Sequence, residues 1–261
     1  MCVGTMRGRM RALCVPCPCP VCPHGRSIVT RPHLTAPREL LISAKCVLFD
    51  FDGPLCRLFP GGTGADVAGR MARRLAESGG DPSVVVEPVT NGDPLGVLVA
   101  AWERYPFDRA LLTALDDLLT AEEEALASEA AVPTEGACEL AKALHGAGVE
   151  LAVTTNNSRR AVVAYLSRRN LLSCFAGRIH GRTADPGRLK PHPDCLHRAL
   201  EQTGVAAGEA LMIGDSAADR IAATAAGVPF LGYAENAMKY QELRKAGPLV
   251  SVSTLTGLLP R

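Results

Sequence analysis

The stretch VLFDFDGPL (Val47–Leu55) decides the fold, because an apolar run that is typical of a buried strand leads directly into two aspartates, Asp50 and Asp52. Alternate side chains of an extended chain point to the same side, so these two carboxylates should share one small volume while Phe51 points away. Two like charges so close raise each other's pKa unless a positive charge lies between them. Three interpretations follow: a divalent metal site, a nucleophile with its acid/base partner, or a strand end in solvent.

From about residue 44 onward, strand-like and helix-like segments alternate along the chain. Buried strands are predicted at 45–50, 149–155, 177–181, 209–215 and 228–233, and helices at 134–148, 158–172, 193–204, 216–227 and 235–247. This alternation predicts an α/β fold with a doubly wound parallel sheet, in which ligands bind at the carboxyl ends of the strands.

Residues 58–131 interrupt the alternation. Helices are predicted at 64–80, 93–106 and 107–131, and only SVVVEPV (83–89) has the pattern of an extended segment. Thirteen acidic and five basic residues give the insertion a net charge of −8, which is typical of helix faces in solvent. The predicted organisation is therefore a core formed by 44–57 and 132–261, with 58–131 as a mainly helical cap.

Residues 1–43 have the composition of a disordered extension rich in cysteine, proline and arginine. Cys14, Cys17, Cys22 and His24 have the short spacings of a zinc or iron–sulfur ligand set, but prolines interleave the thiols and no second cluster accompanies them. We therefore expect no metal there, and we expect a chain that begins at Leu41 to keep its stability. Five further cysteines are scattered as in proteins of a reducing compartment.

The overall composition excludes several classes of partner. At 261 residues with a net charge of +1, the chain has no global field to attract nucleic acid or a membrane surface. No apolar run approaches the roughly 20 residues that span a bilayer, so we expect a cytoplasmic protein. Nothing in the sequence indicates its oligomeric state.

Polar residues follow four of the predicted strands and should meet at one edge of the sheet. They are Asp50 and Asp52, then Thr155 and Asn156, then Lys190, then Asp215 and Asp219. Several carboxylates at one edge repel each other unless a hard cation holds them, and Mg²⁺ prefers oxygen ligands. A lysine and a hydroxyl could hold the oxygens of a phosphoryl group there, and a carboxylate can attack phosphorus to give a phosphoaspartate.

Four motifs occur in a fixed order: DFDGPL (50–55), VTTN (153–156), LKP (189–191) and GDSAADRIAATAAGVP (214–229). This set resembles the haloacid dehalogenase superfamily, and within it the phosphoglycolate-phosphatase-like members with a helical cap. The resemblance extends over about 44–261. It implies a Rossmann-like core and a Mg²⁺-dependent hydrolase acting on phosphoric monoesters through a phosphoaspartate.

The resemblance also implies roles for single residues. Asp50 would be the nucleophile, and Asp52 the acid that protonates the leaving oxygen and then the base that activates water. Thr155 and Lys190 would hold the phosphoryl group, and Asn156 would add a hydrogen bond. The dehalogenases of the superfamily lack the second aspartate, so Asp52 indicates phosphate chemistry.

A metal site is implied in the same way. Mg²⁺ would be bound by Asp50, the main-chain carbonyl of Asp52 and Asp215, with Asp219 orienting water or the lysine.

Two alternatives remain at this point. Phosphonate hydrolases and sugar-phosphate mutases of similar fold use a cap lysine or a histidine–lysine pair, and residues 57–141 contain neither residue type. A non-catalytic phosphate-binding module would not need the acid/base Asp52. The expected partner is a small phosphate ester, and the basic residues of the cap and its flank that could meet a second anionic group are Arg57, Arg70, Arg73, Arg74, Arg104 and Arg109.

Overall fold

A six-stranded parallel sheet forms the centre of the computed structural model, which describes residues 36–85, 92–245, 247 and 249–259. The strands are β1 (Cys46–Phe49), β4 (Glu150–Thr154), β5 (Ile179–His180), β6 (Ala210–Gly214), β7 (Phe230–Tyr233) and β8 (Ser251–Val252), in the order β5-β4-β1-β6-β7-β8. The chain winds outward from β1 through β4 to β5 and then returns to the other side. The predicted doubly wound α/β fold is confirmed, and its switch point lies at β1.

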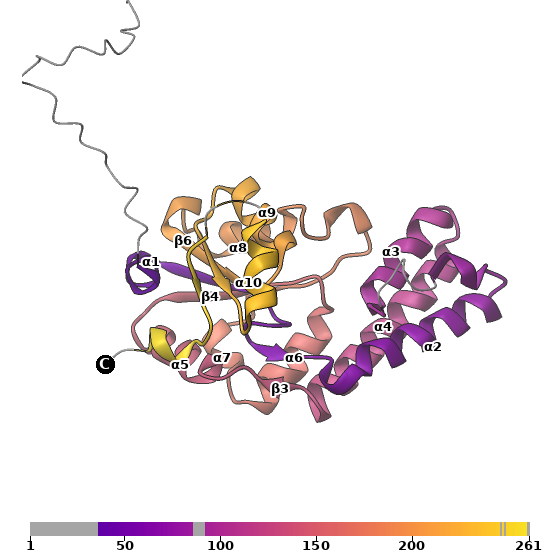
Figure 1. Ribbon diagram of the computed structural model, residues 1–261, viewed down its shortest axis with the longest axis horizontal. Helices are drawn as coiled ribbons and strands as arrows, with labels where there is room; N and C mark the ends of the chain where they lie inside the picture. The colour runs from indigo at the N-terminus through magenta and orange to yellow at the C-terminus, as the bar shows by residue number, and fades with distance from the viewer. Residues whose placement is uncertain (1–35, 86–91, 246, 248, 260–261) are drawn as a thin grey trace, which may run out of the picture. The chain divides into compact units, whose positions relative to one another are not determined.

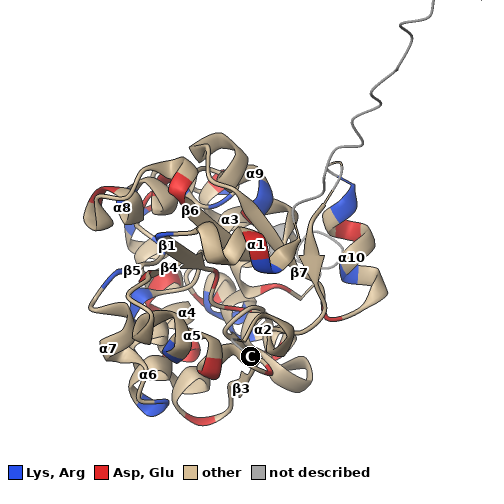
Figure 2. Ribbon diagram, turned by 90° about the vertical axis from the view of Figure 1, so that its left-hand side faces the viewer, with Lys and Arg blue, Asp and Glu red and all other residues tan. Residues whose placement is uncertain are grey.

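Helices cover both faces of this sheet, which explains why β1 is a continuous apolar run. Val47 and Phe49 face a core formed with α5 (Ala137–Gly146), α6 (Arg159–Arg168) and α7 (Leu172–Phe175). Cys46 and Leu48 face the opposite core, formed with α8 (Asp194–Thr203) and α9 (Ala217–Ala226). Figure 2 shows these two helical layers on either side of the strands. The last helix of the core, α10 (Ala237–Arg244), follows β7 and contacts α9.

The inserted segment forms helices of its own, as predicted, and they lie together beside the sheet (Figure 1). They are η1 (Pro60–Gly62), α2 (Thr63–Glu77), η2 (Pro82–Val85), α3 (Pro94–Arg104) and α4 (Arg109–Glu129). Apolar residues of α2, α3 and α4 form a separate hydrophobic cluster. Asp93 and Asp108 cap α3 and α4 by accepting hydrogen bonds from Leu95 N and Leu111 N.

Two details of the insertion differ from the sequence expectations. The extended segment predicted at 83–89 is wrong for 83–85, which belong to the 3₁₀ helix η2, and the remainder lies outside the described residues. A short antiparallel pair, β2 (Cys56–Arg57) with β3 (Val132–Pro133), joins the two ends of the insertion and was not predicted.

The N-terminal boundary of the core is also corrected. Pro37–Ser43 forms helix α1 instead of the end of a disordered extension. Leu41 is buried in the core, and the guanidinium of Arg38 donates a hydrogen bond to the carbonyl of Leu259. Because a chain that begins at Leu41 loses the Arg38 contact and the first residues of α1, the expected dispensability of residues up to 40 is not supported by the structure.

The other N-terminal predictions cannot be compared with the structure, since Cys14, Cys17, Cys22 and His24 lie outside the described residues. The cysteines that the structure describes are free thiols.

The core is completed by the short 3₁₀ helices η3 (Pro186–Arg188), η4 (Ala207–Glu209) and η5 (Thr256–Leu258). Among the described helices, none combines the length and hydrophobicity needed to cross a membrane.

Candidate active site

The carboxyl ends of the parallel strands surround a cavity of about 430 Å³. Its lining includes all seven residues predicted from the strand ends, namely Asp50, Asp52, Thr155, Asn156, Lys190, Asp215 and Asp219. Parallel pairing explains this, because β1, β4 and β6 run side by side in one direction and therefore end at the same edge. The structure thus brings together residues that are separated by as many as 169 positions in the sequence.

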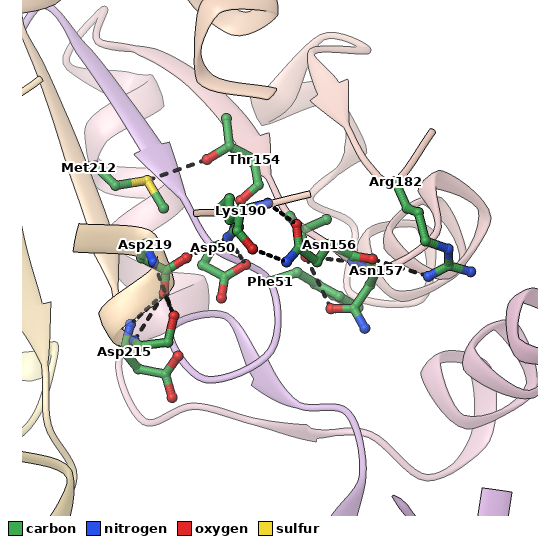
Figure 3. Close-up of polar contacts among 12 residues, drawn as sticks. Asp50, Phe51, Thr154, Asn156, Asn157, Arg182, Lys190, Met212, Asp215 and Asp219 are labelled. Atoms are coloured by element: carbon green, nitrogen blue, oxygen red, sulfur yellow. Dashed lines mark hydrogen bonds and ion pairs between the residues drawn. The ribbon is translucent and has the colours of Figure 1, made fainter. Parts of the chain in front are cut away.

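Lys190 lies at the centre of the cluster, between two carboxylates (Figure 3). Its buried Nζ donates to Asp50 Oδ1 at 2.8 Å, to Asp219 Oδ1 at 2.5 Å and to the main-chain carbonyl of Thr154 at 2.9 Å. Burial by itself would lower the pKa of this ammonium group, but Asp219 and Asp50 outweigh burial and raise it. Lys190 therefore stays charged in the site.

Asn156 fixes the main chain of this lysine. Its Oδ1 accepts from Lys190 N at 2.7 Å, and its Nδ2 donates to the carbonyl of Lys190 at 3.0 Å. Both ends of the amide are thus engaged by the protein. In this structure Asn156 positions Lys190, which is a more specific contact than the hydrogen bond expected from the sequence.

Asp219 is completely buried and has no free oxygen. Its Oδ1 accepts from Lys190, and its Oδ2 accepts from the main-chain N–H groups of Asp215 and Ser216 and from Ser216 Oγ. The last contacts form a capping box at the start of α9, so the same carboxylate begins the helix and holds the lysine.

Asp215 has a partner that the sequence analysis missed. Its Oδ2 accepts from Lys239 Nζ, in α10, at 2.7 Å. The signal was available, since α10 follows β7 and the carboxyl end of β7 lies at the same sheet edge. Burial raises the pKa of Asp215, and Lys239 opposes that shift.

The two aspartates of the first motif lie as alternation predicts. Phe51 is buried against Tyr165, with ring centroids 5.5 Å apart, while Asp50 and Asp52 line the cavity. Burial and the neighbouring Asp219 raise the pKa of Asp50 to about 7, in spite of Lys190. Burial raises the pKa of Asp52 to about 6, although its Oδ1 accepts a hydrogen bond from Leu58 N at 2.7 Å.

A glycine allows the first motif to approach Asp215 closely. Gly53 has φ +113°, a conformation that L side chains rarely adopt, and a Cβ atom there would lie 2.4 Å from Asp215 Cγ. No side chain fits between this turn and the carboxylate.

The donors at this edge fit a divalent cation with oxygen ligands. Carboxylate oxygens of Asp50, Asp215 and Asp219 lie within 4.8 Å of one another. Burial and neighbouring carboxylates raise the pKa of both Asp50 and Asp215, and a bound cation would offset this unfavourable charge. Because both oxygens of Asp219 are already hydrogen-bonded, Asp50 and Asp215 offer the more accessible donors.

The insertion contributes to the same cavity through Glu123 of α4. Glu123 is only 1% exposed and pairs with Arg182 of the core at 3.1 Å, so the expectation of a solvent-exposed acidic face is wrong for this residue. Sequence reasoning also missed Arg182. Of the arginines that were considered for a substrate anion, Arg57 lines the cavity, whereas Arg70 pairs with Glu122 inside the insertion.

Comparisons with known proteins identify the family of the chain. Residues 44–227 match the model of the haloacid dehalogenase-like hydrolase family. The chain is 31% identical over 223 residues to a phosphoglycolate phosphatase of Pseudomonas fluorescens, which covers 83% of this chain and 79% of that protein. It is 35% identical over 196 residues to a phosphoglycolate phosphatase of Rhodospirillum rubrum, with coverage of 71% and 77%.

Solved structures support the same fold. CbbY from Rhodobacter sphaeroides, solved in complex with phosphate, superposes with a TM-score of 0.59 at 21% sequence identity and covers 82% of this chain and 96% of its own. The resemblance inferred from the four motifs is therefore confirmed, as is the expected hydrolase class. By its sequence, its sheet order and the residues at its strand ends, the chain belongs to the haloacid dehalogenase-like hydrolases.

Proposed function

We propose that this protein is a Mg²⁺-dependent phosphatase that hydrolyses a small phosphorylated metabolite through a phosphoaspartate intermediate. The observation that carries the proposal is the contact of the buried Lys190 ammonium group with Asp50, beside a second aspartate of raised pKa, Asp52. The names of its relatives, phosphoglycolate phosphatases, and the phosphate complex of CbbY support the same substrate chemistry.

In the first step, Asp50 attacks phosphorus and the bond to the ester oxygen breaks. Lys190 favours the ionised form of Asp50 that this attack requires. The departing alkoxide takes a proton from Asp52, whose pKa of about 6 leaves a fraction of it protonated near neutral pH. The products of this step are the free alcohol, a phosphorylated Asp50 and an ionised Asp52.

In the second step, the ionised Asp52 removes a proton from water, and the resulting hydroxide attacks the same phosphorus. The acyl-phosphate bond breaks, which restores the Asp50 carboxylate and releases inorganic phosphate. The proton from water replaces the one that Asp52 gave to the alcohol in the first step, so the cycle closes without another acid or base.

Lys190 and Thr155 would hold the non-bridging oxygens of the phosphoryl group. Lys190 brings a positive charge into a cavity that is partly shielded from water, where electrostatic stabilisation of the transition state is largest. Thr155 directly follows β4, and its hydroxyl, which donates to Asn157 Oδ1 in this structure, would donate to a phosphoryl oxygen instead.

Asp50, Asp215 and the main-chain carbonyl of Asp52 would bind Mg²⁺, and Asp219 would keep Lys190 in place. When bound, Mg²⁺ supplies positive charge that offsets the carboxylates and the phosphoryl oxygens. Asp219 was expected among the metal-site residues, and its hydrogen bonds favour the orienting role.

The insertion supports a phosphatase over the two related reactions. The residues that it places at the cavity are Phe59, Asp93, Leu95 and Glu123, among those that the structure describes. None is a lysine or histidine, the residue types that a phosphonate hydrolase or a mutase of this fold would use. A volume of about 430 Å³ also favours a small substrate.

The substitutions Asp50→Asn and Asp52→Asn test the proposal. Asp50→Asn should abolish Mg²⁺-dependent turnover of p-nitrophenyl phosphate, with a loss greater than the ~10²–10⁴-fold typical of a missing acid/base group. Asp52→Asn should lose turnover but keep Mg²⁺ binding close to wild type in calorimetry, because the proposed ligand there is the main-chain carbonyl. A few per cent of residual rate in Asp50→Asn would refute the covalent mechanism.

A further inference from the structure

We propose that Glu123 of the inserted helix α4 is a positioning residue for the phosphoryl-binding hydroxyl of Thr155, and that it acts through the side chain of Asn157. The inference rests on the proposed function and extends it. It assigns to the insertion a part in building the phosphoryl-binding loop that follows β4, in addition to covering the site.

The carboxylate of Glu123 binds that loop directly. Glu123 Oε1 accepts from Asn157 Nδ2 at 3.0 Å, and Oε2 accepts from the main-chain N–H of Ser158, the N-cap of α6, at 2.8 Å. Two consecutive residues of the loop are thus held by one side chain of the insertion. The extensive contacts between α4 and α6 support the same junction.

Arg182 makes this burial of a carboxylate favourable. Its Nη1 lies 3.1 Å and 3.3 Å from the two oxygens of Glu123 and donates to the carbonyl of Asn156 at 3.1 Å, while its Nε pairs with Asp116 at 2.7 Å. The Arg182 and Glu123 side chains are both 2% exposed. A buried charge pair of this kind is stable when every donor and acceptor is satisfied, and the network meets that condition for Glu123.

The network also sets the direction of each hydrogen bond. An ionised carboxylate only accepts, so Asn157 must turn its Nδ2 toward Glu123 and its Oδ1 toward Thr155. The Thr155 hydroxyl donates to that Oδ1 at 3.0 Å and accepts from Asn157 N at 3.1 Å. These two contacts fix Oγ1 in one position at the edge of the cavity and orient the hydroxyl as a donor, and a bound phosphoryl oxygen would replace Asn157 Oδ1 as its acceptor.

A purely structural role for Glu123 would be to attach the insertion to the core. The neighbouring Glu122 provides a matched control, because it lies on the same helix and pairs with an arginine, Arg70, at 2.5 Å, but inside the insertion. Glu122→Gln therefore removes a similar ion pair without touching the phosphoryl-binding loop.

The test compares Glu123→Gln with Glu122→Gln by calorimetric binding of inorganic phosphate with Mg²⁺ present, and by kcat and KM. Glu123→Gln removes the carboxylate that holds Asn157 and Ser158, so the Thr155 hydroxyl loses its fixed position and phosphate affinity should fall about tenfold, which corresponds to ~1.4 kcal/mol, the order of one hydrogen bond to a charged group. The phosphate affinity of Glu122→Gln should stay within about twofold of wild type, because the loss of a partly exposed ion pair usually has a small effect.

A double-substitution cycle separates positioning from stability. If Glu123 acts through Thr155, then Thr155→Val combined with Glu123→Gln should bind phosphate as Thr155→Val does alone. Losses that multiply in the double variant, or equal effects of Glu123→Gln and Glu122→Gln, would overturn the inference. If Glu123→Gln does not fold, Asn157→Ala must show the same loss of phosphate affinity, and wild-type affinity in that variant would overturn it equally.

The two proposals fail in different ways. A wild-type protein without turnover would refute the phosphatase, while the phosphate affinities of the variants would still decide the role of Glu123. If the wild type turns over substrate and Glu123→Gln binds phosphate as tightly as the wild type, only the positioning role is refuted. A wild-type protein that binds no phosphate would refute both.

Discussion

Replacement of Gly53 by alanine should weaken Mg²⁺ binding at the proposed metal site far more than it destabilises the fold. Gly53 has φ +113°, so alanine there strains the backbone by about 1–2 kcal/mol. In addition, the new Cβ would lie 2.4 Å from Asp215 Cγ and within 2.7 Å of both Asp215 oxygens, where ordinary contacts are 3.4–4 Å. Either the turn or the carboxylate must therefore move by about 1 Å.

A displacement of that size is large for this site. Mg²⁺ requires near-ideal octahedral distances of about 2.0–2.1 Å, and a 1 Å misplacement of a catalytic group can reduce the rate about 10²-fold. We expect Gly53→Ala to weaken Mg²⁺ binding in calorimetry at least about tenfold and to reduce kcat/KM by about 10²-fold.

Gly148→Ala is the matched control for backbone strain. Gly148 also has a positive φ, +80°, but a Cβ atom there meets nothing within 4 Å. This variant should lose about 1 kcal/mol of stability and keep its Mg²⁺ affinity. If Gly53→Ala matched Gly148→Ala in Mg²⁺ affinity and in kcat/KM, the close approach of the first motif to Asp215 would not matter for metal binding, and the reasoning would be refuted.

Three further outcomes are expected. Burial, reinforced by Arg198, lowers the pKa of His180 to about 4, so the unfolded state takes up a proton first and stability falls as the pH drops from about 6.5 toward 4. Between pH 7 and pH 5 the wild type should lose about 2 kcal/mol more than His180→Gln in chemical denaturation, and parallel curves would contradict this. Leu41→Ala should cost about 2 kcal/mol because Leu41 is buried, whereas Ile42→Ala, at a side chain that is 83% exposed, should stay within about 0.5 kcal/mol; equal melting temperatures would show that α1 adds nothing. The best phosphorylated metabolite of a broad panel should exceed any phosphopeptide at least about tenfold in kcat/KM, and a phosphopeptide that matched it would exclude a cavity closed by the insertion.

The core of the site could be predicted because parallel strands impose a simple rule. Apolar runs such as Val47–Phe49 identify buried strands, parallel strands end at one sheet edge, and the residues that follow them must converge there. Asp50, Thr155 and Asp215 meet in one cavity for that reason alone. The same rule would have reached Lys239 if it had been applied to the strand that precedes α10.

The partner of each charged side chain could not be predicted from the sequence, and the run Glu122–Glu124 shows why. Consecutive residues of a helix point about 100° apart, so these three identical side chains face three environments. Glu122 pairs with Arg70 inside the insertion, Glu123 is buried against Arg182, and Glu124 pairs with Arg160. All three residues are glutamate, so the sequence alone does not tell which one is buried; the packing of α4 gives each its own partner.

The sequence by itself therefore determined the doubly wound sheet and the set of residues at its carboxyl edge, because both follow from local periodicity and from strand direction. The tertiary structure alone decided which hydrogen bond each carboxylate makes, how β2 and β3 join the ends of the insertion, and that α1 belongs to the core. These features depend on contacts between segments far apart in the chain, such as Lys190 with Asp50 and Arg182 with Glu123. The physical reason is that periodicity fixes the side of an element on which a side chain lies, whereas its partner is chosen by the packing of elements against each other.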